Sequence, residues 1–186
     1  MSIVRFTIGA LLLVVFAQPA GAQVSHPTAD VFAGYSLFPA AGDDFPRGTS
    51  HGVQVTAAVH LNRWFGVIGD MGAQFSTNRD LGPNFSGQVA HTRVVELLVG
   101  PRFTARSDRA DVFVHGLFGT SRGDAGPGFE GFSDSGVTFG GGGGVDIRLT
   151  RRLAVRAGFD LMGSFADIVD VNSRFSAGLV VNLGAR

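Results

Sequence analysis

The sequence predicts an all-β fold, an eight-stranded antiparallel up-and-down barrel. Three observations predict it. Apolar residues alternate with small or polar residues in eight separate runs, and the segments between these runs are alternately long and short. The composition is unusual for a soluble enzyme, with 28 glycines, 17 phenylalanines and charged residues at only 16% of a 186-residue chain.

The first 22 residues have the three parts of a secretory signal peptide. Arg5 gives a positive start, residues 6–17 form an apolar stretch, and Ala20-Gly-Ala22 has the small-x-small form that signal peptidases cleave. The alternative is a membrane anchor, but the apolar stretch is shorter than the roughly 20 residues of a transmembrane helix. We therefore expect a signal peptide over residues 1–22 and one barrel domain over residues 23–186.

The eight alternating runs define the predicted strands. Within each run every second side chain is apolar, so one face of the strand is apolar and the other is small or polar. The run lengths approach the 9–11 residues that a tilted strand needs to cross a bilayer. No later segment carries apolar residues at helical spacing over three turns. The runs are residues 31–37, 53–61, 65–75, 95–103, 112–118, 137–149, 153–161 and 175–183.

The connections alternate in length. An up-and-down barrel gives this alternation when the turns at one rim are short and the loops at the other rim are long. An even number of strands also places both termini on the short-turn side. The long connections are 39–51, 76–90 and 122–136, with 166–173 somewhat shorter, and the short ones are 62–64, 105–111 and 150–152.

Two short turns predict strand register. Leu149 facing Leu153 keeps each face of that hairpin chemically uniform, and Leu61 facing Phe65 does the same for the other. A slip of one residue would move every side chain to the opposite face. The pairs that follow are Ile147–Val155, Val145–Ala157, Gly143–Phe159, Gly141–Leu161 and Asp146–Arg156 in one hairpin, and Val59–Val67 in the other.

The distribution of charge predicts which face meets lipid. The apolar face is nearly free of charge, as lipid contact demands, because a lipid-facing arginine at mid-depth costs about 2–4 kcal/mol. His91 and Arg93 are exceptions that we place at the headgroup rim. The polar face points into the barrel, where paired charges would form a lumen charge network that plugs it. Its predicted members are Asp70, Glu96, Arg102, Asp146, Arg148, Arg156, Asp160 and Arg174. The sequence therefore predicts a transmembrane β-barrel.

Aromatic residues lie close to the ends of several predicted strands. Such positions fit the aromatic girdles of membrane barrels, with ordinary core packing as the alternative. The residues are Trp64, Phe65, Phe75, Phe103 and Phe165.

Several short segments resemble a known family. They are Val31-Phe-Ala-Gly-Tyr-Ser36, Asn62-Arg-Trp-Phe-Gly-Val67, Gly100-Pro-Arg-Phe103 and Leu149-Thr-Arg-Arg-Leu-Ala-Val-Arg156. With the signal peptide, they make residues 31–184 resemble the small outer-membrane β-barrel superfamily, which includes the OmpA transmembrane domain and the opacity-type surface proteins. The resemblance implies that the last strand is read by the barrel-insertion machinery. Ser176, Gly178, Val181 and Leu183 match that signal, although the family usually ends in Phe or Trp and this chain continues Leu183-Gly-Ala-Arg.

The motifs of other function classes are missing. Five consecutive glycines, residues 140–144, lack the Lys-Ser/Thr and helix of a phosphate loop and instead indicate strand glycines in a tight barrel. The histidines at positions 26, 51, 60, 91 and 115 have no metal-ligand spacing, and no G-x-S-x-G occurs. His115 and Glu96 could share the interior of neighbouring strands, without a hydroxyl that recommends itself as nucleophile. The sequence thus predicts neither an enzyme nor a cofactor.

The predicted function follows from location. We expect a structural or surface-exposed protein in the outer membrane of a Gram-negative-type bacterium, reached by secretion to the periplasm. Its partners would be outer-membrane lipid, the insertion machinery and an extracellular partner at the long connections. A net charge of zero argues against nucleic acid. The alternatives are a secreted soluble lipocalin-like carrier, which would turn its apolar face inward, and a narrow outer-membrane channel.

Overall fold

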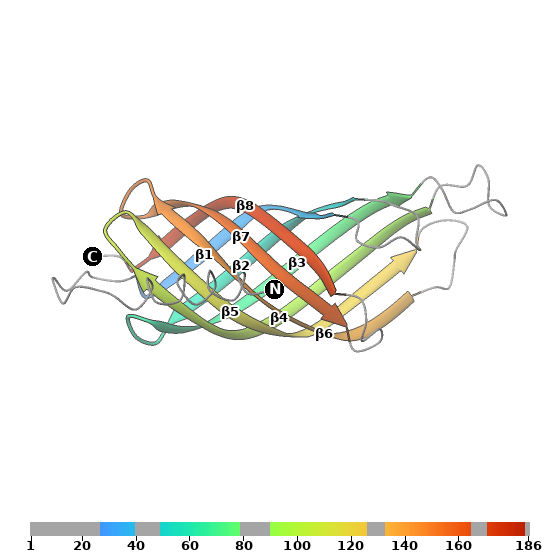
Figure 1. The fold of residues 1–186 in the computed structure, drawn as a ribbon, viewed down its shortest axis with the longest axis horizontal. Coiled ribbons are helices and arrows are strands. Elements are labelled where there is room, and N and C mark those ends of the chain that lie inside the picture. The colour runs from blue at the N-terminus through green and yellow to red at the C-terminus, as the bar shows by residue number, and fades with distance from the viewer. Residues whose placement is uncertain (1–26, 40–48, 79–89, 126–132, 165–170, 185–186) are drawn as a thin grey trace, which may run out of the picture.

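The chain folds into a closed barrel of eight antiparallel strands, which neighbour one another in sequence order (Figure 1). The computed structural model describes residues 27–39, 49–78, 90–125, 133–164 and 171–184. The predicted signal peptide lies outside these residues. The predicted fold class is confirmed. The strands are β1 Ala29–Phe38, β2 Ser50–His60, β3 Phe65–Asn78, β4 Ala90–Arg106, β5 Ala110–Ala125, β6 Ser133–Arg148, β7 Leu153–Ser164 and β8 Val171–Leu183.

The barrel closes where β1 pairs with β8. Gly34 lies opposite Gly178 in this pair. A Cβ atom on Gly178 would lie 2.3 Å from the carbonyl oxygen of Ala33, and one on Gly34 would lie 2.4 Å from that of Ala177. The two strands thus approach too closely for a side chain at either position. Closure leaves no open edge, which is the condition for a sheet to lie in lipid.

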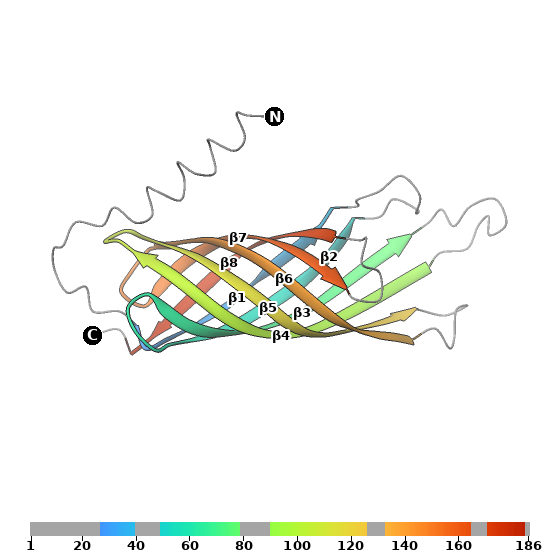
Figure 2. The same cartoon turned by 60° about the horizontal axis from the view of Figure 1, so that its bottom comes forward.

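The hairpin registers predicted from the two short turns are confirmed. Asp146 pairs with Arg156 across β6 and β7, and Val59 pairs with Val67 across β2 and β3. The Leu149 amide donates to the carbonyl oxygen of Leu153 at 2.9 Å, which closes the turn as expected. The three short turns gather at one end of the barrel (Figure 2).

The strands are longer than their apolar runs, so the predicted connections are too long. β5 continues to Ala125 and β6 begins at Ser133, where the sequence predicted a connection over 122–136. At the other end the predicted 105–111 connection shrinks to residues 107–109. The reason is that backbone pairing continues where the outward side chains turn polar, as at the exposed Arg93 and Arg122. The apolar alternation therefore marks the lipid-facing part of a strand rather than its full length.

The two faces of the sheet have the predicted orientation. The outward face is apolar and exposed in all eight strands, as at Val55, Leu97 and Leu179. The inward face carries the buried polar residues and two small apolar clusters, one around Ile68 and Leu98 and one around Phe32 and Val180. This is the inverse of a soluble carrier barrel. Within the described part of the chain, no helix is long and apolar enough to cross a membrane.

Candidate functional site

The charged interior is the candidate site, and strand alternation builds it. All eight predicted lumen charges lie on the inward face. Seven of them are buried, and Arg148 is half-buried near the short-turn end. The seven fall into two groups at different depths, joined by Asp30, His60 and His115, which had not been predicted as members of the network.

The turn-side cluster consists of Asp30, His60, Arg102, Asp146 and Arg156. Arg156 binds Asp146 through two nitrogens, Nε to Oδ1 at 2.6 Å and Nη2 to Oδ2 at 2.8 Å. Arg102 reaches Asp146 at 3.1 Å and Asp30 at 3.1 Å, and Arg156 also reaches Asp30 at 3.0 Å. His60 Nε2 lies 2.8 Å from Asp30. Two guanidinium groups thus meet two carboxylates.

Aromatic rings support the turn-side cluster. The guanidinium carbons of Arg102 and Arg156 lie 4.1 and 4.6 Å from the centre of the Phe113 ring. Phe32 lies 5.1 Å from the guanidinium of Arg156. Cations over aromatic faces are attracted more strongly when both groups are desolvated. The rings therefore provide favourable contacts for guanidinium faces that carry no ion pair.

The loop-side cluster consists of Asp70, Glu96, His115, Asp160 and Arg174. Arg174 is fully buried and binds Asp70 through two nitrogens at 3.1 and 3.0 Å. Its Nε donates to Asp160 at 2.9 Å, and its Nη1 to Glu96 at 3.3 Å. His115 Nε2 lies 2.8 Å from Asp160. Here one guanidinium serves three carboxylates, so the cluster carries excess negative charge when all three are ionised.

Several of these contacts cross the barrel rather than follow a hairpin. Arg174 on β8 and Glu96 on β4 belong to strands that stand opposite each other in a closed order of eight. Arg102 on β4 and Asp30 on β1 are three strands apart. Such contacts tie distant walls of the barrel together through its interior.

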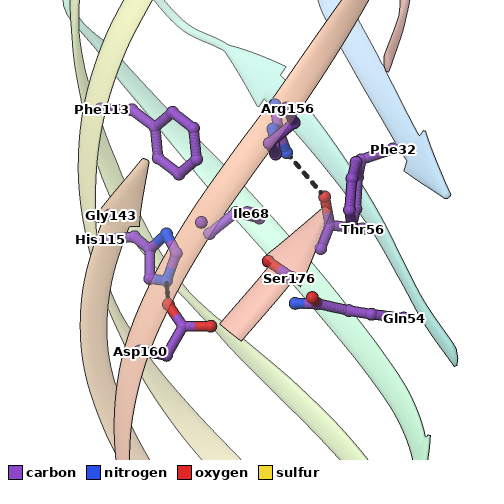
Figure 3. Close-up of a pocket in the computed structure, with 11 residues that line it drawn as sticks. Phe32, Gln54, Thr56, Ile68, Phe113, His115, Gly143, Arg156, Asp160 and Ser176 are labelled. Atoms are coloured by element: carbon purple, nitrogen blue, oxygen red, sulfur yellow. Dashed lines mark hydrogen bonds and ion pairs between the residues drawn. The ribbon is translucent and has the colours of Figure 1, made fainter. Parts of the chain in front are cut away.

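A small cavity lies between the two clusters (Figure 3). Its volume is about 10 Å³, close to the minimum that one water molecule needs. The lining includes Gln54 and His115, whose Oε1 and Nδ1 atoms are buried and lack a hydrogen-bond partner among the described residues. The cavity is therefore too small for an organic ligand, and its polar lining suits a single water.

Arg148 joins neither cluster. It pairs instead with Asp111 at 2.5 Å, at the short-turn rim. Asp30, His60, Asp111 and His115 were missed as network members. Strand alternation could have predicted that Asp30 and His60 face inward, because each directly precedes an outward apolar residue of its run.

His115 and Glu96 share the barrel interior on the neighbouring strands β5 and β4, as expected, but they are not cross-strand partners. In the β4–β5 register Glu96 faces Ser121, whereas His115 faces Arg102. The two are six residues apart along the strands, which carries His115 to Asp160 on β7. Ser121 itself accepts a hydrogen bond from the Thr138 hydroxyl at 2.7 Å. In the ranges that the structure describes, no group of three His, Asp or Glu side chains could hold a metal ion.

The residues of the expected insertion signal divide between the two faces of β8. Val181 and Leu183 are exposed on the outward face, and Ser176 and Gly178 are partly buried on the inward one. Gly178 belongs to the closure seam described above. At the short-turn rim the Trp64 ring stacks on Phe103 with centres 5.8 Å apart, and Phe65 lies 5.2 Å from Phe103.

The other aromatic and rim predictions fall at the opposite end. Phe75 lies 5.8 Å from the guanidinium carbon of the exposed Arg93. Phe165 and the side chain of His91 lie outside the described residues.

Solved structures of several bacterial proteins have the same fold. The Ail attachment invasion locus protein of Yersinia pestis, crystallised with a heparin analogue, has a TM-score of 0.60 at 14% identity over 84% of this chain and 98% of its own. Neisserial surface protein A has a TM-score of 0.62 at 12% identity, covering 84% and 97%. The N-terminal barrel of Pseudomonas aeruginosa OprF has a TM-score of 0.52 at 9% identity, covering 84% and 98%. These likenesses show the fold.

The family assignment comes from the sequence itself. No curated protein sequence matches the chain. The family described as the outer membrane protein beta-barrel domain matches residues 8–182. That match covers nearly all of the chain, from before β1 to the last residue but one of β8, and agrees with the closed barrel and its apolar exterior. The chain therefore belongs to the outer membrane protein β-barrel family.

Proposed function

We propose that this protein is a structural or surface-exposed outer-membrane barrel whose interior is closed by the two ionic clusters. The observation that carries the proposal is the set of buried ion pairs across the lumen, above all those of Arg174 with Asp70, Glu96 and Asp160. The long connections then meet the outside of the cell, while the barrel serves as their membrane anchor. The proposal includes no catalytic step.

Geometry and energetics support a closed interior. In an eight-stranded barrel the interior is just wide enough for side chains to fill. A water path along the axis would have to pass Arg174 and then Arg102 and Arg156, whose nitrogens are held by carboxylates on several strands. Removing one partner of such a buried pair commonly costs about 3–5 kcal/mol. Thermal opening of both clusters would therefore be rare.

The same proposal includes a route to the membrane. A signal peptide over residues 1–22 would direct export to the periplasm, and the last strand would be recognised by the insertion machinery. The outward exposure of Val181 and Leu183 supports this reading, because these side chains are accessible to a partner before lipid covers them. Outer-membrane lipid is then the permanent partner of the apolar face.

Planar-bilayer recording tests the closed interior. The wild-type barrel should give no conductance steps above the bare bilayer. Arg174→Ala combined with Arg102→Ala and Arg156→Ala should give steps, because the side chains that cross the lumen are then gone. Arg93→Ala is the matched control, since Arg93 is an exposed outward residue and its loss should open nothing.

Folding of each variant is checked on a denaturing gel. A folded barrel that has not been heated migrates at a different position from the same protein after boiling. If the triple variant does not fold, Arg174→Met is recorded alone, because it removes the ion pairs of the loop-side cluster and leaves those of the turn-side cluster in place. Steps of smaller conductance are then expected. Steady conductance steps from the wild-type protein would overturn the proposal and favour the narrow channel instead.

A further inference from the structure

The short-turn rim concentrates exposed arginines. Each of the three short turns carries at least one: Arg63, Arg109, and the adjacent Arg151 and Arg152. Asp108 is the one exposed carboxylate among the described residues of these turns. The whole chain has equal numbers of acidic and basic residues. The rim is therefore a local surplus of positive charge in an otherwise neutral protein.

These arginines are not needed to build the turns. Asn62 Oδ1 accepts hydrogen bonds from the Trp64 and Phe65 amides at 2.9 and 2.8 Å. Thr150 Oγ1 does the same for the Arg152 and Leu153 amides at 3.2 and 3.0 Å. Short polar side chains thus close the turns locally. No side-chain partner for Arg63, Arg151 or Arg152 occurs among the residues that the structure describes.

The nearby acid is already occupied. Asp111 is buried and shared by Arg148, at 2.5 Å, and Arg106, at 3.9 Å. Arg106 also donates to the carbonyl oxygen of Arg63, and Arg148 to that of Ser107 at 2.7 Å. These two arginines brace the turns from below. Asp111 is therefore paired with Arg106 and Arg148 and does not neutralise the charge of the exposed arginines.

The exposed arginines lie at the height of lipid headgroups. The apolar outer surface reaches the turns themselves, where the exposed fraction is 53% for Trp64 and 58% for Leu149. Arg63 directly precedes Trp64, and Arg151 comes two residues after Leu149. Tryptophan and arginine at a barrel end are typical of the layer between hydrocarbon and water. The arginines thus meet headgroups rather than acyl chains or bulk solvent.

We propose that the short-turn rim, Arg63, Arg109, Arg151 and Arg152, binds the phosphates of anionic glycerophospholipids in the leaflet that adjoins it. A guanidinium fits a phosphate through paired hydrogen bonds and keeps its charge at every physiological pH. Basic residues at an anionic membrane surface attract it appreciably, and salt screens the attraction. The adjacent Arg151 and Arg152 make the turn between β6 and β7 the strongest part of this rim.

The single tryptophan of the chain makes a direct test possible. Trp64 stands beside Arg63, so brominated lipids that gather there quench its fluorescence. The wild-type barrel is reconstituted in phosphatidylcholine vesicles with a minor fraction of phosphatidylglycerol, with the bromine on one lipid or the other. Phosphatidylglycerol should be enriched at Trp64 on the order of five-fold over its bulk share at low salt. In 0.5 M salt, a test concentration of about three times the physiological one, the enrichment should shrink towards none.

A second probe reads the opposite side of the rim. Leu149→Trp in a Trp64→Phe background places the fluorophore beside Arg151 and Arg152, and it should report the larger enrichment. Changing Arg63, Arg109, Arg151 and Arg152 to Gln should abolish the enrichment at both probes. Arg93→Gln with Arg122→Gln removes two exposed arginines from the other end of the barrel and should leave it intact.

Two results would overturn the proposal. Quenching by the two brominated lipids in proportion to their bulk shares at low salt would mean that the rim does not select anionic phospholipid. Enrichment that survives in the quadruple glutamine variant would mean that other groups attract the lipid. Both results come from tryptophan quenching, which does not depend on whether the lumen conducts. This proposal and the proposed closed interior can therefore fail separately.

Discussion

Asp146 illustrates what a buried carboxylate requires inside a narrow barrel. It accepts two bonds from Arg156 and one from Arg102, so both of its oxygens are occupied. The attraction between buried ions mostly repays the cost of removing them from water, so such a pair is better understood as fixing geometry than as adding stability. Here the geometry fixed is the β6–β7 register together with the position of β4 across the lumen.

A double-mutant cycle tests this pair. Asp146→Ala and Arg156→Ala should each destabilise the folded barrel by about 3–5 kcal/mol, because each leaves a buried charge with fewer partners. The double variant should lose less than the sum of the two. Reversible denaturant unfolding in lipid or detergent gives the free energies. Strictly additive losses would mean that the two side chains do not interact.

The sequence could predict Asp146–Arg156 but not the rest of the network. A short turn sets which residues face each other across one hairpin, and alternation then sets the face. Contacts such as Arg102 with Asp30 or Arg174 with Glu96 join strands that are not neighbours. They depend on barrel diameter and strand tilt, which no local pattern encodes. For the same reason the contact of His115 with Asp160 could not be predicted.

At the scale of the element, β6 shows why a run of glycines can be a strand. Gly143 is partner to Phe159 in the register with β7, and a Cβ on it would lie 2.3 Å from the carbonyl oxygen of Phe113 on β5. Gly141 is partner to Leu161, but a Cβ there would meet only the His115 carbonyl oxygen at 3.7 Å. Neighbouring backbone therefore approaches closely at the first position and not at the second.

These two glycines predict opposite tolerances. Gly143→Ala should destabilise the barrel by about 1–3 kcal/mol, because β5 has to move to admit a methyl group. Gly141→Ala, two residues away on the same face, should change stability by less than about 0.5 kcal/mol. Denaturant midpoints of the two variants in the same lipid provide the comparison. Equal losses would show that a general loss of strand glycine, and not the close approach, is responsible.

Strand ends were the least predictable property of the elements. Alternation identified all eight strands and the face of every residue in the runs, because burial on one side leaves a period of two. It stopped at residue 118 in β5, although pairing continues to Ala125. Beyond the membrane both faces are polar, so the pairing persists without the pattern that reveals it.

At the scale of the whole molecule, the up-and-down order places all three short turns at one end. β1 begins and β8 ends at that same end, so one rim carries the short turns and the other carries the long connections (Figure 1). The proposed topology puts the short-turn rim in the periplasm. The native chain has no cysteine, so a single introduced one reports its own location.

Cysteine labelling of intact cells tests this topology. Arg151→Cys should be inaccessible to a membrane-impermeant maleimide until the outer membrane is permeabilised, because its turn faces the periplasm. Asn84→Cys, in the connection between β3 and β4, should react in intact cells. The cysteine-free wild type controls for background. The reverse pattern would invert the barrel in the membrane.

The central claim is that lipid covers the apolar face while the charged face lies inside. Nitroxide labels at successive single cysteines along β7, residues 153–161, measure it most directly in reconstituted bilayers. Oxygen, which concentrates in lipid, should broaden the signals at 155, 157, 159 and 161 strongly and those at 154, 156, 158 and 160 weakly, with a period of two. If the barrel does not tolerate a label in place of the buried Arg156 or Asp160, positions 154 and 158 still report on the inward face. Uniform oxygen access along the strand, or strong access of a water-soluble nickel complex at 155, 157 and 159, would contradict the account.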